Sequence, residues 1–181
     1  MIKSYDKDNK AVKLLKEAID LFAEGETIHD YLSRNAHSEG LQGFKRWHRV
    51  QSAEDRNHRI ELQHYAIDQF SMNIEVEYEI KELVPKSIME HLEFYLEWEI
   101  NVYEQIARIS RELVDEFPYE AELVLKPLDG VTKEIQKIRR WLQDFKYTEE
   151  DKSYIKLCDK VLHDKVKKIE EKWFDNIREL C

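Results

Sequence analysis

The sequence predicts an all-α protein: a four-helix bundle made of two helical hairpins joined by a long crossover, with an extended fifth helix at the C-terminus. Only four of the 181 residues are glycine and three are proline, while 37% are charged. Sheets need more turn-forming residues than this, whereas Lys, Glu and Leu favour helices. Apolar residues also recur every three or four positions, which is the period of an amphipathic helix. This length suits one compact domain over residues 1–181, with the bundle at about 9–147 and the last helix at about 149–180.

The first two helices are expected at 9–36 and 41–71. In the first, Leu14, Leu21, Ile28 and Leu32 lie near one face. A break at 38–43, which contains two glycines, separates it from the second. The inward stripe of the second helix mixes apolar and polar residues: Phe44, His48, Gln51, Asp55, His58, Leu62 and Tyr65.

The segment 72–84 alternates polar and apolar residues, which predicts an extended connection. At ~3.3 Å per residue, about a dozen residues span close to 40 Å, so the third helix need not run antiparallel to the second. Pro85 and Ser87 open that third helix, which extends to about Leu113. Pro118 begins the fourth helix, in which Pro127 and Gly130 predict a kink.

Four of the predicted helices carry acidic or imidazole groups on their apolar faces: Glu24, the pair Asp55 and His58, Glu99, and Glu134. A carboxylate on a core-facing stripe must be desolvated, so it persists only if it is paired, hydrogen-bonded or bound to a cation. Residues three apart project to the same side of a helix, so Asp55 and His58 can offer an oxygen and a nitrogen to one ion. The pattern predicts a carboxylate-bridged pair of metal ions inside the bundle.

The predicted ligands are hard, rich in oxygen, and include an imidazole. This set suits iron or manganese and, less well, zinc. It is one histidine short of the di-iron bundle pattern, in which two helices each supply Glu-x-x-His.

Three stretches of the sequence resemble ferritins. The run from Gly40 to His58, GLQGFKRWHRVQSAEDRNH, is similar to the second ferritin helix, which leads from Gly-x-x-x-Phe through Gln-Ser to Glu-Glu-Arg-x-His. The first helix carries Tyr-Leu-Ser at 31–33, and the third carries Glu-Ile-Asn-Val at 99–102, similar to the Glu-x-Asn-Val of the family. Together these matches cover roughly 14–145.

The resemblance implies a ferritin-like bundle whose di-iron centre oxidises iron(II) with oxygen or peroxide, for storage or detoxification. It assigns Glu24, seven residues before Tyr31, as the ligand from the first helix, and it gives Tyr31 a catalytic role as a hydrogen-bond partner of a ligand. Glu134 matches an additional ligand of some microbial members.

Three departures from the ferritin pattern affect these expectations. Asp55 replaces a Glu and shortens the reach of the side chain by ~1.5 Å. Val131 replaces a Gln that orients oxygen or water in the family. The last helix is long and charged where the ferritin one is short and apolar, so a dimer or another small homo-oligomer is expected more than a closed shell.

Each site assignment has a plainer interpretation. Asp55 and His58 could form a surface pair if their helix were rotated slightly, and Glu134 has polar neighbours one step away. Glu24 lies beside Gly25, so a neighbour of Glu24 could be the inward residue. Gly25 costs a helix ~1 kcal/mol, which indicates close packing or distortion. Four other histidines are interpreted as surface or hydrogen-bonded side chains: His48, His64, His91 and His163.

Two other functions stay open: a non-storing di-metal oxidase or peroxide scavenger of the same fold, and a metal-free helical interaction bundle. The net charge of −9 and the absence of a basic tail argue against nucleic acid as a partner. The sequence contains no run of about 18 apolar residues, which a membrane-spanning helix would need. The polar start of the chain, without the apolar segment of a secretory signal, leads us to expect a cytoplasmic protein.

Overall fold

Six helices make up the computed structural model of the protein, which describes residues 9–78, 85 and 87–179. They are α1 (Lys10–Ser38), α2 (Gln42–Phe70), α3 (Ile88–Leu113), α4 (Pro118–Leu125), α5 (Leu128–Tyr147) and α6 (Lys152–Glu179). The expected all-α fold is confirmed, and no strand occurs within these described ranges.

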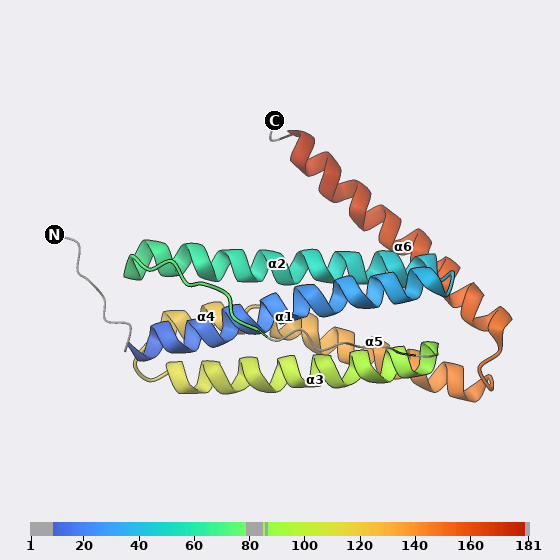
Figure 1. Ribbon diagram of the computed structural model, residues 1–181, viewed down its shortest axis with the longest axis horizontal. Coiled ribbons are helices and arrows are strands. Elements are labelled where there is room, and N and C mark those ends of the chain that lie inside the picture. The colour runs from blue at the N-terminus through green and yellow to red at the C-terminus, as the bar shows by residue number, and fades with distance from the viewer. Residues whose placement is uncertain (1–8, 79–84, 86, 180–181) are drawn as a thin grey trace.

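The bundle has four positions. α1, α2 and α3 each occupy one, and α4 and α5 together occupy the fourth (Figure 1). α1 and α2 form an antiparallel hairpin. α3 begins at the opposite end of the bundle from the point where α2 ends, so the two helices are not joined as a tight antiparallel hairpin, as the sequence predicts. Ile74 of this connection is buried against the core. Part of the connection, 79–84, lies outside the described residues.

The fourth predicted helix is interrupted instead of kinked. α4 ends at Leu125 and α5 begins at Leu128. Pro127 has no backbone N–H to donate and its ring clashes with the carbonyl four residues earlier, so the helix cannot continue through it unchanged. This break lies beside the central cavity described below, whose lining includes Pro127 and Gly130.

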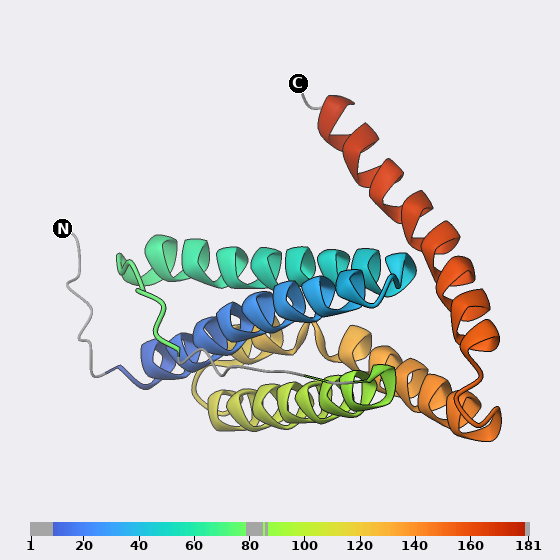
Figure 2. The same ribbon diagram turned by 45° about the vertical axis from the view of Figure 1, so that its right-hand side comes forward.

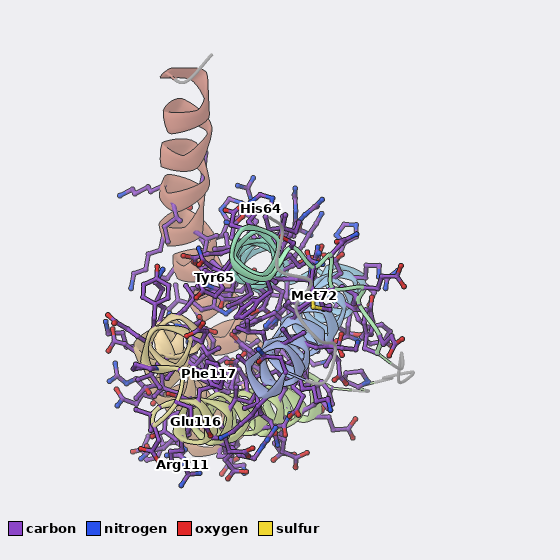
Figure 3. All side chains as sticks on the ribbon, turned by 90° about the vertical axis from the view of Figure 1, so that its left-hand side faces the viewer. His64, Tyr65, Met72, Arg111, Glu116 and Phe117 are labelled. Carbon is purple, nitrogen blue, oxygen red and sulfur yellow. The ribbon has the colours of Figure 1, made fainter. Side chains whose placement is uncertain are left out.

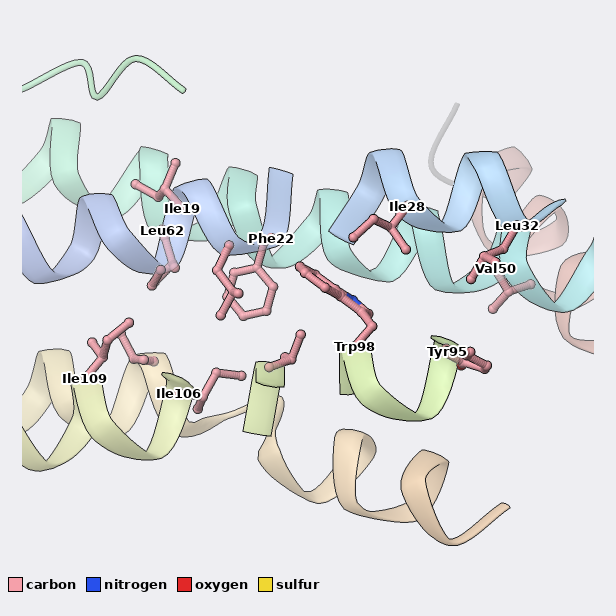
Figure 4. Close-up of a cluster of buried hydrophobic side chains, with 14 of the residues drawn as sticks. Ile19, Phe22, Ile28, Leu32, Val50, Leu62, Tyr95, Trp98, Ile106 and Ile109 are labelled. Atoms are coloured by element: carbon pink, nitrogen blue, oxygen red, sulfur yellow. The ribbon is translucent and has the colours of Figure 1, made fainter. Parts of the chain in front are cut away.

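The apolar stripes of the helices meet in one core along the bundle axis. An end-on view shows the helices side by side, with charged side-chain tips pointing outward (Figure 3). Fully buried residues come from all four positions, among them Leu15, Phe44, Ile106 and Ile138. Midway along the bundle, Phe22 and Trp98 face each other from α1 and α3 (Figure 4).

The first part of α6 packs on the start of α2. The N-cap of α2, Leu41, offers no side-chain hydrogen bond. Asp159 of α6 takes this role, because its Oδ1 accepts from the backbone N–H of Phe44 at 2.9 Å. A Cβ at Gly43 would lie 1.9 Å from the Asp159 carbonyl oxygen, so only glycine allows this approach.

Beyond this contact α6 leaves the bundle at an angle (Figures 1 and 2). Up to residue 169, where side-chain burial is described, its exposed large apolar side chains are Leu157, Val161 and Ile169. Among the residues that the structure describes, no helix has the length and apolar character needed to cross a membrane.

Replacing Gly43 by alanine tests the docking of α6. The added methyl would overlap backbone of α6, so we expect Gly43→Ala to lower the free energy of unfolding by about 1–3 kcal/mol. The measurement is thermal unfolding followed by circular dichroism, where ~1 kcal/mol corresponds to about 2–4 °C for this size.

Gly130→Ala is the matched control. A Cβ there meets no heavy atom within 4 Å, so this helical substitution should leave stability unchanged or raise it by up to ~1 kcal/mol. Equal melting temperatures for the two variants would show that α6 does not pack on α2 in this way.

Candidate metal centre

A cavity of about 50 Å³ lies in the middle of the bundle. A water molecule needs roughly 10–15 Å³ of such space, so the cavity can hold several water-sized groups or ions. Its lining includes polar side chains from four helices: His29 from α1, Gln51, Glu54, Asp55 and His58 from α2, Glu99 from α3, and Glu134 from α5.

Four residues named from the sequence therefore lie around one space: Asp55, His58, Glu99 and Glu134. Glu99 and Glu134 are buried, while Asp55 and His58 are partly buried. The His58 ring packs against Phe22, with 5.4 Å between ring centroids. The helical spacing of Asp55 and His58 thus places both toward the interior and not on an outer face.

Glu134 is fixed by a tyrosine that the sequence argument did not single out. The Tyr95 hydroxyl donates a short hydrogen bond to Oε2 of Glu134 and accepts one from Trp47 Nε1 at 3.0 Å. Tyr95 lies one helical turn before Glu99 on α3, so a single face of that helix provides both a carboxylate and the donor that orients another. Spacing on the Glu99 stripe is the signal that could have identified Tyr95.

His29 is the second residue that the sequence argument missed. It is fully buried, and its Nε2 lies 3.4 Å from Oε1 of Glu99 and 3.7 Å from Oδ2 of Asp55. Its helical stripe, which includes Phe22 and Gly25, could have identified it, since these positions are three or four apart.

Glu24 and Tyr31 lie elsewhere on α1. Glu24 lines a separate recess, together with Asp20, Tyr78 and Arg108. The Tyr31 ring lies 5.8 Å from the guanidinium carbon of Arg34 and does not line the cavity. Their roles as ligand and catalytic residue remain predictions, and in this structure the face of α1 toward the cavity is formed by Phe22, Gly25 and His29.

Gly25 lets α1 approach α2 closely. A Cβ at this position would lie 2.3 Å from Oδ2 of Asp55 and 3.4 Å from Cζ2 of Trp98. The close packing predicted from a glycine within the helix is confirmed. The Asp55 carboxylate occupies the space that a side chain at Gly25 would otherwise fill.

Burial and mutual repulsion oppose ionisation of the cavity carboxyl groups. Burial, with a contribution from Glu54, raises the pKa of Glu99 to about 8. Burial and the nearby Glu99 raise the pKa of Glu134 to about 8, and burial raises that of Asp55 well above its usual value. A divalent cation in the cavity would reverse this balance by stabilising the ionised forms.

The donor set fits hard divalent ions, because it combines carboxylate oxygens with imidazole nitrogens. The side chains are not already arranged as a finished coordination shell: among the described residues, no group of three or more His, Cys, Asp or Glu has geometry ready to hold an ion. Binding would therefore require small side-chain movements within the cavity.

Trp98 also lines the cavity. Its Nε1–H is buried and is the one such side-chain atom without a hydrogen-bond partner among the described residues. Leaving a buried donor unpaired costs about 1–3 kcal/mol.

Solved structures of ferritins share this fold. One is an open-pore ferritin from the hyperthermophilic archaeon Archaeoglobus fulgidus, with a TM-score of 0.77 and 20% identity, over 86% of this chain and 96% of that one. An engineered closed form of the A. fulgidus ferritin gives 0.77 at 19% identity, over 86% and 96%. A humanized archaeal ferritin gives 0.73 at 23% identity, over 85% and 95%.

No family profile matches the sequence, and comparison with curated proteins gives no match. At these identities the likeness establishes the fold. The chain has the four-helix-bundle fold of these ferritins together with a long C-terminal helix, and the predicted fold is confirmed.

The raised carboxyl pKa values predict how the metal-free protein responds to pH. Between about pH 6.5 and 8, the folded protein keeps protons on Glu99 and Glu134 that the unfolded chain has released. The free energy of unfolding should therefore fall as pH rises through this window. Below pH 6.5 the buried histidines oppose this trend, because burial lowers the pKa of His29 and His91 to about 4.

Thermal unfolding in the presence of a chelator checks this expectation. Glu99→Gln keeps the shape of the side chain and removes its charge, so it should raise the stability of the metal-free protein at pH 8 by about 1–3 kcal/mol and flatten the pH dependence. A matched change on the exposed face of α3, Glu97→Gln, should do neither. A wild-type melting temperature that rises from pH 6.5 to 8 would contradict the assignment.

Proposed function

We propose that the chain binds a pair of iron(II) ions in the central cavity and oxidises them, with oxygen or peroxide as the electron acceptor, for storage or detoxification. The observation that carries this proposal is the meeting of Asp55, Glu99 and Glu134 from three helices around one cavity. Buried carboxyl groups so close together are costly unless a cation or protons neutralise them.

In this proposal His58 adds a nitrogen ligand beside Asp55, and the carboxylate of either Asp55 or Glu99 bridges the two ions. Iron(II) is the substrate. Hard anionic ligands bind iron(III) more strongly than iron(II), so they make the loss of an electron to oxygen or peroxide more favourable. Manganese or zinc would suit the same donors as substitutes.

The surrounding side chains have roles that follow from their contacts. Tyr95 holds one oxygen of Glu134 and leaves the other for an ion. Phe22 and Val102 provide apolar walls that limit access of bulk water.

The two open alternatives predict different outcomes. A non-storing oxidase or peroxide scavenger would turn over iron without forming a mineral core, and sedimentation after iron loading separates it from a storage protein. A metal-free interaction bundle would allow Asp55 and His58 to face solvent. Their place in the cavity lining favours the metal-binding proposals.

We also propose a homo-oligomer, in which the exposed apolar residues of α6 take part. Because α6 diverges from the bundle, we favour a dimer or another small assembly over a shell. The cytoplasmic location remains a prediction from the sequence.

The metal content of protein purified from iron-supplemented cells tests the proposal. We expect about two iron ions per chain, and loss of this iron in the double variant Asp55→Ala/His58→Ala. Glu99→Ala should lower both the iron content and the rate of iron(II) oxidation, because it removes a candidate bridging carboxylate. His64→Ala, on an exposed face of α2, should match the wild type.

Far more than two ions per chain would indicate a stored core. Absence of iron from the wild-type protein, after reconstitution with iron(II) under anaerobic conditions as well, would reject the proposal in favour of the metal-free bundle. Unchanged iron content in Glu99→Ala would reject the ligand assignment.

A further inference from the structure

Three buried histidines form a continuous hydrogen-bonded chain that ends at the cavity. Nδ1 of His29 lies 3.1 Å from Nδ1 of His48, and Nε2 of His48 lies 2.8 Å from Nε2 of His91. Nδ1 of His91 lies 2.9 Å from Oδ1 of Asn35. All three imidazoles are at most 2% exposed, so protein groups and not bulk water decide where their protons lie.

At the end of the histidine chain that is far from the cavity, the direction of the hydrogen bonds is fixed. The Asn35 amide donates from Nδ2 to the backbone carbonyl of Pro85 at 3.3 Å. A carbonyl can only accept a hydrogen bond, so the amide nitrogen must face Pro85 and the amide oxygen must face His91. The proton of a neutral His91 therefore lies on Nδ1, where it is donated to that oxygen.

This direction passes along the chain to the cavity. A neutral imidazole carries one N–H, so Nε2 of His91 is an acceptor and Nε2 of His48 must donate to it. Nδ1 of His48 is then an acceptor, and His29 must donate from Nδ1. Nε2 of His29 consequently presents a lone pair to the cavity, where it faces Glu99 and Asp55.

The neutral state that this reasoning requires is consistent with burial. Desolvation lowers the pKa of His29 and of His91 to about 4 and that of His48 well below its usual value. A lone pair 3.4 Å from a carboxylate oxygen also needs something positive between the two atoms, since both are acceptors. A proton on Glu99 meets this need in the metal-free protein, and a metal ion would meet it equally.

We propose that His29 supplies a nitrogen ligand from α1 to the metal centre through Nε2, and that His48, His91 and Asn35 are positioning residues that hold it in the required tautomer. This inference rests on the proposed metal binding. In this proposal the ligand from α1 is His29, one helical turn after Gly25, in place of the predicted ligand Glu24. It also supplies the second imidazole that the di-iron bundle pattern requires.

Glu26 and His29 have the Glu-x-x-His spacing, but the carboxylate of Glu26 pairs with an arginine and not with the cavity. Glu26 precedes His29 by three residues, yet its carboxylate accepts from Arg59 at 3.0 Å. Only the histidine of this spacing therefore reaches the cavity. The Asp55 carboxylate lies where Gly25 leaves room, so α1 contributes nitrogen where α2, α3 and α5 contribute oxygen.

Cobalt(II) provides a test independent of turnover. It is a paramagnetic divalent ion, so an imidazole N–H on a coordinated ring gives a strongly shifted proton resonance that disappears if the proton exchanges rapidly with water. The Nδ1–H of His29 is buried and donated to His48, so its resonance should persist in water. His58→Gln should retain this resonance, and His29→Gln should lose it while remaining folded by circular dichroism.

Cobalt affinity tests the positioning chain. Asn35→Leu removes the acceptor that fixes the direction of the histidine hydrogen bonds. We therefore expect cobalt to bind about 10-fold more weakly, the lower end of the range for losing a hydrogen-bond partner of a metal ligand. Asn35→Asp keeps an acceptor and should bind more tightly than Asn35→Leu. His64→Ala, on the exposed face of α2, should bind as the wild type does.

The outcomes separate this inference from the proposed function. If wild-type protein binds no cobalt, iron(II) or manganese(II), both fail. If it binds metal but cobalt-loaded His58→Gln shows no shifted exchangeable resonance, His29 is not a ligand while the proposed function stands. Unchanged cobalt affinity of a folded His29→Gln would lead to the same conclusion. The His58→Gln spectrum decides the point even if His29→Gln fails to fold.

Discussion

The structure depends on how the bundle accommodates acidic groups in its interior. Asp55, Glu99 and Glu134 come from three helices, and burial together with repulsion from neighbouring carboxylates, including Glu54, raises the pKa of each. Such a cluster weakens a core that apolar residues would fill at lower cost. Hydrogen bonds from Trp47 to Tyr95 and from Tyr95 to Glu134 orient one of these carboxyl groups. This combination of cost and order is typical of a functional site.

The packing of the helices also shapes the cavity. Gly25 lets α1 approach the Asp55 carboxylate, and the interruption at Pro127 places the start of α5 beside the cavity. Asp159 secures the start of α2 from outside the bundle, so α6 contributes to the helix that carries Asp55 and His58. The long C-terminal helix is thus part of the fold as well as a candidate surface for assembly.

The sequence predicted the helices, the crossover and three cavity carboxylates because each depends on periodicity or on a carboxylate among apolar neighbours. It assigned Glu24 as the ligand from α1, which stays a prediction. It did not identify Gly25 and His29, which the structure places near Asp55, because the pattern of apolar positions does not resolve a rotation of α1 by one residue. The cap from Asp159 and the alignment of His29, His48 and His91 depend on contacts between helices far apart in sequence, which periodicity within one helix does not reveal. The low sequence identity to solved ferritins has the same consequence: the fold is shared, and the ligand set must be established on this chain.

Asp55, Glu99 and Glu134 are proposed to hold divalent ions in the cavity. A crystal structure of the protein soaked with manganese(II), with anomalous scattering used to locate the metal, tests it most directly. We expect anomalous peaks within the cavity, at bonding distance from these carboxylates. Peaks confined to the recess beside Glu24, or none inside the bundle, would contradict it.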